Sequence, residues 1–118
     1  MKKTYEGGCH CKNVRYSVEL DLDEPVIECN CSHCQIKGIL WQFVPKASFT
    51  LLQGEDSLKE YLFNTKKIRH QFCTNCGVEP FAYGVGPDGA ETAAINVRSI
   101  DDVDLAALTR MPANGKDF

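Results

Sequence analysis

The sequence has no long hydrophobic run, no surplus of positive charge and no internal repeat. Its longest apolar stretches, such as 39–41 and 93–95, are far shorter than the roughly 20 residues that a membrane-spanning helix needs. Thirteen Lys and Arg against sixteen Asp and Glu give a formal net charge of −3, so no basic excess is present to neutralise a phosphate backbone. We therefore expect neither a membrane nor a nucleic acid among the partners of this protein.

An export signal is missing as well. Lys2 and Lys3 are followed by TYEGG at 4–8, which supplies no apolar segment of the kind that a secretory signal contains. The expected location is therefore cytoplasmic. In that reducing compartment disulfides do not explain seven cysteines in a chain of 118 residues, and metal binding is the first alternative.

The composition is that of one globular domain spanning 1–118. Apolar residues make up 43% and charged residues 25%, which are ordinary values for a folded domain of this length. Apolar and polar residues alternate from Val14 to Leu20, as in a strand with one buried face. Further strand-like runs are 26–29, 39–44, 49–52, 58–63, 68–72, 80–85 and 92–97. Many short strands at close spacing predict a mainly β, antiparallel fold.

One short helix is predicted near the C-terminus. Asp101 or Asp102 can cap the apolar segment 103–108, which is long enough for about two turns. The segment 112–118 has Gly, Asn and Pro without periodicity, and we expect it to be irregular.

Seven cysteines in three clusters are the strongest signal in the sequence. They are spaced as Cys9-x-Cys11, Cys29-x-Cys31-x-x-Cys34 and Cys73-x-x-Cys76. Two thiolates held two or three residues apart in a tight loop can bind one ion, because Zn–S bonds are only about 2.3 Å long. Buried free thiols or disulfides are the alternative, but the number is odd and such short disulfide loops are strained. We predict zinc, with iron as the second choice for a four-cysteine set.

Seven ligands divide into four and three. We assign Cys9, Cys11, Cys73 and Cys76 to a closed structural zinc site, and Cys29, Cys31 and Cys34 to a second zinc with an open position. Closed tetrahedral sites are structural, whereas an open position is where chemistry takes place. The prediction is two zinc ions per chain, with the three-cysteine set as the catalytic one.

Three histidines compete for the fourth position of the open site. His33 lies within the three-cysteine loop and His10 between the first two cysteines, so each is expected to point away from an ion that its neighbours hold. His70 alternates with Ile68 and Phe72, which is typical of a histidine on a strand face. Histidine is a common zinc ligand, so this alternative stays open.

Several motifs around the cysteines carry a family resemblance. They are GCHC at 8–11 before VRY at 14–16, CNCSHC at 29–34, FCTNCG at 72–77 with Pro80-Phe81, and INVR at 95–98. Together they resemble the glutathione-dependent formaldehyde-activating enzyme family, and the sequence looks like one of its short members. A related domain occurs in chromosome-associated proteins (centromere-protein-V-like). The resemblance implies stacked antiparallel sheets, a structural zinc at the first and last cysteine pairs and a catalytic zinc at the middle three cysteines. The sequence departs from the family pattern at Ser99, where short members often have another cysteine.

The resemblance also implies a reaction. The thiol of glutathione adds to formaldehyde and gives S-hydroxymethylglutathione, which is a carbon–sulfur lyase reaction in reverse. An ion held by three thiolates is a weak Lewis acid for water, but it holds a fourth sulfur as thiolate. Since glutathione is anionic, Lys37 and Arg98 are candidate contacts, although isolated Lys and Arg are mostly solvated. The alternative function is a zinc-stabilised binding module without catalysis.

Overall fold

The protein is described here by a computed structural model that covers residues 2–62 and 68–114. These residues form ten strands, one α-helix and four 3-10 turns. The strands are β1 (Lys3–Gly8), β2 (Arg15–Leu20), β3 (Val26–Cys29), β4 (Trp41–Pro45), β5 (Phe49–Gln53), β6 (Leu58–Tyr61), β7 (Arg69–Cys73), β8 (Phe81–Val85), β9 (Glu91–Asn96) and β10 (Arg110–Ala113). The helical segments are α1 (Ser32–Lys37), η1 (Lys46–Ser48), η2 (Glu55–Ser57), η3 (Val97–Ser99) and η4 (Leu105–Ala107).

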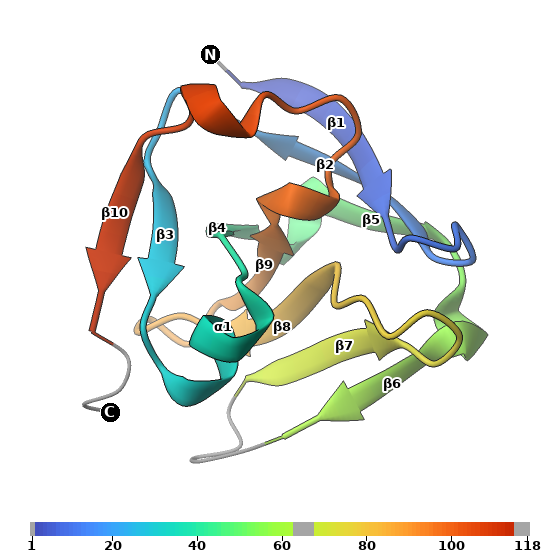
Figure 1. Cartoon of the computed structure of the whole chain (residues 1–118). Coiled ribbons are helices and arrows are strands. Elements are labelled where there is room, and N and C mark those ends of the chain that lie inside the picture. Colours follow the sequence, from blue (N-terminus) through green and yellow to red (C-terminus); the bar gives the residue numbers. More distant parts are fainter. Residues whose placement is uncertain (1, 63–67, 115–118) are drawn as a thin grey trace.

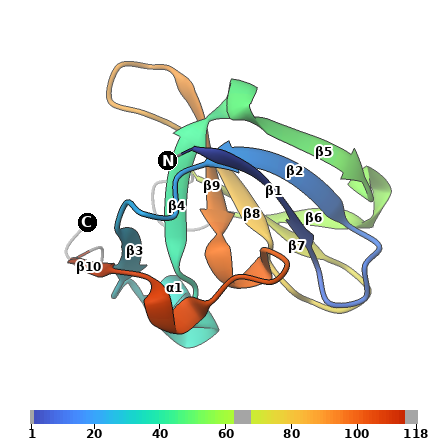
Figure 2. The ribbon, with the colours of Figure 1, turned by 90° about the horizontal axis from the view of Figure 1, so that it is seen from above.

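The strands form two sheets. β1, β2 and β5 make an antiparallel sheet of three strands, and the other seven strands follow the order β10-β3-β4-β9-β8-β7-β6. In Figure 1 the smaller sheet lies above the longer one, which runs from β10 and β3 on one side to β7 and β6 on the other. Figure 2 shows β1, β2 and β5 crossing over β6, β7 and β8. The predicted mainly β fold of stacked sheets is confirmed, with β10 beside β3 as a parallel pair.

The main core lies between the two sheets. Tyr16, Val18 and Leu20 on β2 are each at most 1% exposed, while the residues between them are partly or fully exposed. They pack with Phe49 of β5 and Phe81 of β8, whose ring centroids are 4.6 Å apart. The alternation in the sequence therefore marks the face that the smaller sheet buries.

The longer sheet also has a second buried face. Phe81 and Ile95 point into the main core, whereas their neighbours Ala82 and Ala94 belong to a separate cluster with Trp41 and the α1 region. Because successive side chains of a strand point to opposite faces, the two alanines leave room for α1 to pack against the sheet. The two cysteine sets consequently lie on different faces of the same sheet.

The C-terminal part differs in detail from the prediction. The short helix is a single 3-10 turn, η4, and its cap is Asp104, whose carboxylate accepts a hydrogen bond from the N–H of Ala106. The expected irregular tail contains β10 up to Ala113, a strand that pairs with β3 through a register no local pattern encodes. Pro112 fits this strand because β10 is at the edge of the sheet. Residues 63 and 115–118 of the predicted segments lie outside the described ranges.

Across residues 2–62 and 68–114, every helix falls short of the length and apolar character that a membrane span requires.

Candidate metal centres

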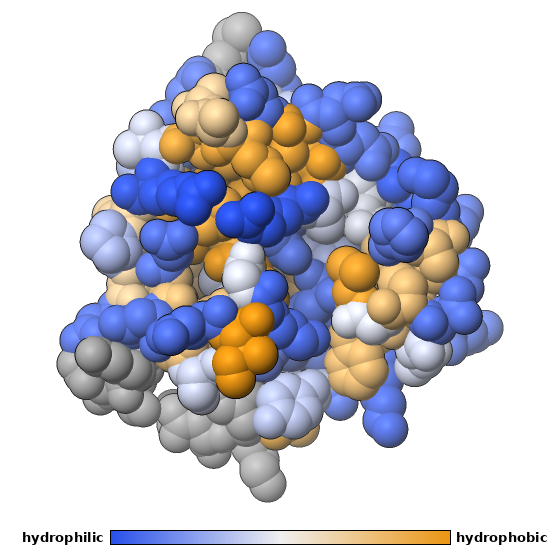
Figure 3. Space-filling view, viewed as in Figure 1, coloured by the Kyte–Doolittle hydropathy of each residue, from blue (hydrophilic) through white to orange (hydrophobic). Residues whose placement is uncertain are grey.

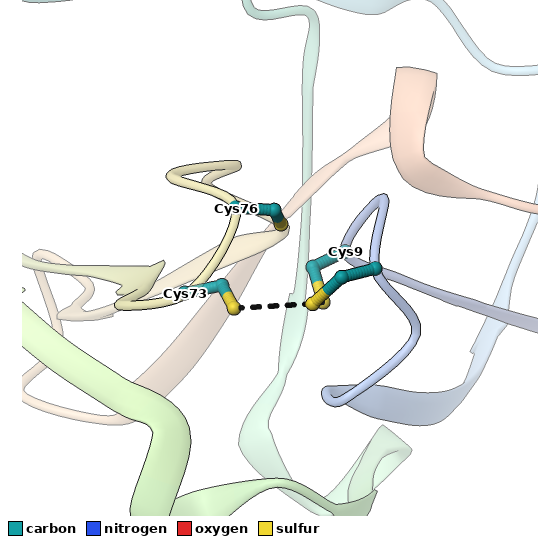
Figure 4. A group of neighbouring side chains, drawn as sticks. Cys9, Cys73 and Cys76 are labelled. Atoms are coloured by element: carbon teal, nitrogen blue, oxygen red, sulfur yellow. Dashed lines mark hydrogen bonds between the residues drawn. The ribbon is translucent and has the colours of Figure 1, made fainter.

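Two loops bring the four-cysteine set together. Cys9 and Cys11 lie between β1 and β2, and Cys73 and Cys76 lie at the end of β7 and in the turn after it. The four Sγ atoms are all within 4.8 Å of one another, and Cys11 Sγ is 3.5 Å from Cys9 Sγ and 3.6 Å from Cys73 Sγ. Figure 4 shows the side chains of Cys9, Cys73 and Cys76 pointing toward a common centre. The edge of a zinc–sulfur tetrahedron is about 3.8 Å, so the spacing fits such an ion.

Backbone N–H groups support these sulfurs. Val14 N–H donates to Cys9 Sγ (3.3 Å) and Asn75 N–H donates to Cys73 Sγ (3.4 Å). Gly77 adopts a φ of 79°, which lets its N–H turn back to the carbonyl of Cys73 (2.8 Å). Such N–H···S contacts orient sulfur ligands and disperse their negative charge.

The ionisation of the four-cysteine set is uneven. Burial raises the pKa of Cys9 to about 11, whereas a hydrogen bond from Asn75 lowers the pKa of Cys11 to about 6. Close thiols that cannot all ionise share protons. A divalent cation replaces the protons and allows all four sulfurs to bind as thiolates, so the donor set fits a metal ion. None of the seven cysteines forms a disulfide.

The three-cysteine set is built around α1. Cys29 ends β3, Cys31 is the N-cap residue of α1, and Cys34 lies in its first turn. Their sulfurs are also within 4.8 Å of one another. Cys31 N–H donates to Cys29 Sγ (3.5 Å) and Cys34 N–H donates to Cys31 Sγ (3.3 Å). The helix was not predicted, because a cysteine sulfur here occupies the capping position that Ser, Thr, Asp or Asn usually takes.

Trp41 holds the buried member of this set. Its indole N–H donates to Cys34 Sγ at 3.1 Å, and both side chains are buried. Burial raises the pKa of Cys34 to about 12, although the hydrogen bond from Trp41 acts in the opposite direction. Trp41 is thus both a core residue and a direct partner of a sulfur.

A pocket opens beside the three-cysteine set. It has a volume of about 350 Å³, and Cys29, Cys34, Gln35 and Arg98 are among the residues that line it. Because Cys29 and Cys34 line this pocket, the three-cysteine set is accessible from one side, as an open metal site requires. The surface of the molecule on the side that Figure 3 shows is mostly hydrophilic, and hydrophobic residues gather mainly in its upper part.

A buried carboxylate that the sequence did not reveal lies next to this set. Glu79 is 3% exposed. Its Oε2 is 2.6 Å from His70 Nδ1, and its Oε1 is 3.0 Å from His33 Nε2 and 3.3 Å from Lys37 Nζ. The other ring nitrogen of His33 is 3.9 Å from Cys34 Sγ. Glu79 therefore ties α1, which carries Cys34, to β7.

The charge of Glu79 is stabilised by these partners. Burial alone would raise the pKa of this carboxyl, but hydrogen bonds from His33 and His70 outweigh it and bring the pKa to about 2. His33, His70 and Glu79 offer donor atoms within 4.8 Å of one another. One nitrogen of each imidazole nevertheless faces a different oxygen of Glu79, and the ammonium of Lys37 opposes a cation. The cluster is therefore a hydrogen-bonded network.

The other candidate residues have different positions. His10 is exposed, and His70 is buried on β7 in the strand-face position expected for it. Lys37 is bound to Glu79, so it is not a purely solvated side chain. Arg98 is exposed at the pocket.

Comparison with known proteins agrees with this architecture. Residues 4–111 match the family described as "Glutathione-dependent formaldehyde-activating enzyme". A crystal structure of a Rhodobacter sphaeroides protein, a Northeast Structural Genomics target, is similar with a TM-score of 0.78 and 27% sequence identity. The similarity covers 91% of this chain and 97% of that chain. The chain therefore belongs to the glutathione-dependent formaldehyde-activating enzyme family.

Proposed function

We propose that the protein is a zinc-dependent enzyme of the carbon–sulfur lyase type that joins a glutathione-like thiol to a small aldehyde such as formaldehyde. Membership of the family supports a glutathione-related, formaldehyde-activating function. The observation that carries the proposal is the difference between the two cysteine sets. The four sulfurs of one set lie within 4.8 Å of one another and are enough for a closed tetrahedral site, whereas Cys29 and Cys34 of the three-cysteine set line an open pocket.

In this proposal the two sets hold two zinc ions with different tasks. The structural ion is held by Cys9, Cys11, Cys73 and Cys76, and the second by Cys29, Cys31 and Cys34. An ion held by three thiolates lowers the pKa of an incoming thiol, which then binds as thiolate.

The reaction needs neither an oxidant nor a reductant. A carbon–sulfur bond forms between the thiol sulfur and the carbonyl carbon, while the π bond of the carbonyl opens. The proton of the thiol ends on the former carbonyl oxygen, so the product is an S-hydroxymethyl adduct. The indole N–H of Trp41 donates to the sulfur of Cys34, which lines the pocket, and the backbone N–H of Cys34 donates to the sulfur of Cys31.

We also propose residues 1–118 as a single zinc-binding domain that works in the cytoplasm. A small-molecule thiol and an aldehyde would be its partners, rather than a nucleic acid or a membrane. The net charge of −3 supports this choice.

Metal analysis and thiol titration test the proposal. Elemental analysis should find two zinc ions per chain, and the absorption spectrum of the cobalt-substituted protein should shift when glutathione is added. Formaldehyde should be consumed only when a thiol is present, and the Cys34→Ser variant should lose both responses. A wild-type spectrum that ignores excess thiol would mark the site as structural and favour a zinc-stabilised binding module. One metal per chain, or iron, would contradict the ligand assignment.

A further inference from the structure

The pocket beside the three-cysteine set contains one cation without an acidic partner. Arg98 lines this pocket together with Cys29 and Cys34. Within residues 2–62 and 68–114 the guanidinium of Arg98 makes no ion pair, and the hydrogen bond of this residue to Asn96 comes from its backbone N–H. Arg98 is exposed and lines the pocket, so its guanidinium is available to a ligand there.

The neighbouring charges are already paired. Glu28 also lines the pocket, but its carboxylate is 3.2 Å from the guanidinium of Arg110. Lys37 is the other cation close to the three-cysteine set, and its ammonium is bound to buried Glu79. The sequence suggested Lys37 and Arg98 as contacts for an anionic substrate. Because Lys37 is bound to Glu79, Arg98 is the better candidate of the two.

Arg98 is mounted on a well-anchored turn. Its backbone N–H donates to Asn96 Oδ1 (3.2 Å), and Asn96 Nδ2 donates to the carbonyl of Glu79 (2.9 Å). The next residue, Ser99, shares a hydrogen bond of 2.7 Å with the Tyr16 hydroxyl and donates to the Asn96 carbonyl at 2.7 Å. Because the backbone is fixed on both sides of Arg98, a ligand has to order only the arginine side chain, which lowers the entropic cost of binding.

Electrostatics explains why a cation is needed at this place. Three thiolates (−3) around a divalent ion (+2) leave a net charge of −1, which repels an anionic thiol. A guanidinium in the lining of the same pocket offsets this repulsion and binds a carboxylate through paired N–H donors. The volume of about 350 Å³ lies within the range of small-molecule sites.

We propose that Arg98 binds the carboxylate of an anionic thiol in this pocket and thereby makes the site selective for thiols that carry a carboxylate. This inference rests on the proposed function, because it requires the thiol to bind at the three-cysteine set. It adds a residue that determines specificity and predicts which thiols are poor substrates.

A matched pair of thiols tests the inference. N-acetylcysteine and N-acetylcysteine amide carry the same thiol, but only the first has a carboxylate. Each is titrated into the cobalt-substituted protein, and the absorption change gives the dissociation constant. Arg98→Gln should weaken binding of the acid about tenfold, as expected for loss of a charge-assisted hydrogen bond, and should leave the affinity for the amide within about twofold. Arg98→Lys should restore part of the preference.

A control separates this effect from a change in net charge. Lys46→Gln removes one positive charge from η1. This turn follows the C-terminal end of β4, whereas Trp41, which contacts the three-cysteine set, is at the N-terminal end of that strand. The substitution should therefore change the affinity for neither thiol. Equal losses for acid and amide in Arg98→Gln, or no loss for either, would overturn the role of Arg98 while leaving the proposed function intact. If neither thiol changes the spectrum of the wild type, the proposed function fails and the inference fails with it.

Discussion

The two cysteine sets pack on opposite faces of the longer sheet and connect very different lengths of chain. The four-cysteine set joins the loop after β1 to the turn after β7, from Cys9 to Cys76, and its buried members belong to the main core. The three-cysteine set is contained in 29–34 and packs with α1 on the other face. A cross-link that closes a long loop removes more entropy from the unfolded chain than one that closes a short loop. We therefore expect an ion in the first set to stabilise the fold, and an ion in the second set to exchange a ligand without unfolding the chain.

The largest effect is expected from the four-cysteine set. Cys73→Ser removes a fully buried sulfur from the proposed structural zinc site, and structural zinc contributes on the order of 10 kcal/mol in small domains. That is comparable with the whole free energy of unfolding of a typical domain, so the variant should be unfolded or insoluble. Circular dichroism and thermal denaturation in the presence of zinc measure this. A soluble variant with an unchanged Tm would show that Cys73 is not a ligand of a structural ion.

The equivalent change in the three-cysteine set should be much milder for the fold. Cys34→Ser should retain one zinc and lose all thiol-dependent activity, while the free energy of unfolding falls by about 2 kcal/mol, as estimated for a short closed loop. Metal content and urea unfolding of the same sample give both numbers. The proposed difference between a structural and an exchangeable site would be contradicted if this variant kept both ions, or if it unfolded as completely as Cys73→Ser.

Glu79 gives a smaller effect with a defined pH dependence. Glu79→Gln should lower the free energy of unfolding by about 1.5 kcal/mol, because hydrogen bonds to a buried charge are replaced by neutral ones. The folded-state pKa of about 2 lies below the ordinary carboxyl value of about 4.3. The stabilisation is therefore fully present above the ordinary value and is lost as the pH falls toward 2.

Urea unfolding of wild type and Glu79→Gln at several pH values tests this sign. The difference in free energy between the two proteins should not narrow between pH 7 and pH 5, and it should decrease only below about pH 4. A difference that already decreases between pH 7 and pH 5 would mean that Glu79 takes up its proton in that range. This result would contradict the stabilisation of its charge by His33 and His70.

The smallest effect concerns a single N–H···S contact. Trp41→Phe removes the indole N–H that lies 3.1 Å from Cys34 Sγ, and it should lower the free energy of unfolding by about 1 kcal/mol. Loss of an outer partner of a metal ligand typically weakens metal binding by at least about tenfold, so zinc should leave the three-cysteine set at a correspondingly lower chelator concentration. The four-cysteine set serves as the internal control. Equal weakening of both sites would indicate a general loss of stability.

The fold was predictable where the pattern is local. The alternation in 14–20 marks β2, and the segment 26–29 coincides with β3. β1 was missed, because its residues Lys3–Gly8 include no regular apolar alternation and the strand exists through its pairing with β2. Gly7 and Gly8 permit this close pairing, since a Cβ at Gly8 would lie 1.9 Å from the carbonyl oxygen of Val14.

The candidate site was predictable to the extent that it depends on spacing. The division of seven cysteines into four and three follows from their clusters, and the structure brings the sulfurs of each set together; metal binding itself stays a prediction. Glu79 was missed, because nothing in its neighbourhood in the sequence shows that β7 and α1 surround it. Its function depends on contacts with His33 and His70 that only the folded chain creates.

Stepwise removal of zinc while the fold is monitored tests the central claim most directly. A chelator is added to the zinc-loaded protein, released zinc is measured with an indicator dye, and circular dichroism is recorded on the same samples. The first equivalent should leave while the spectrum stays close to native, because the three-cysteine set is open and closes only a short loop. The second equivalent should leave together with unfolding. Unfolding that accompanies the first equivalent would contradict the assignment of a structural and an exchangeable site.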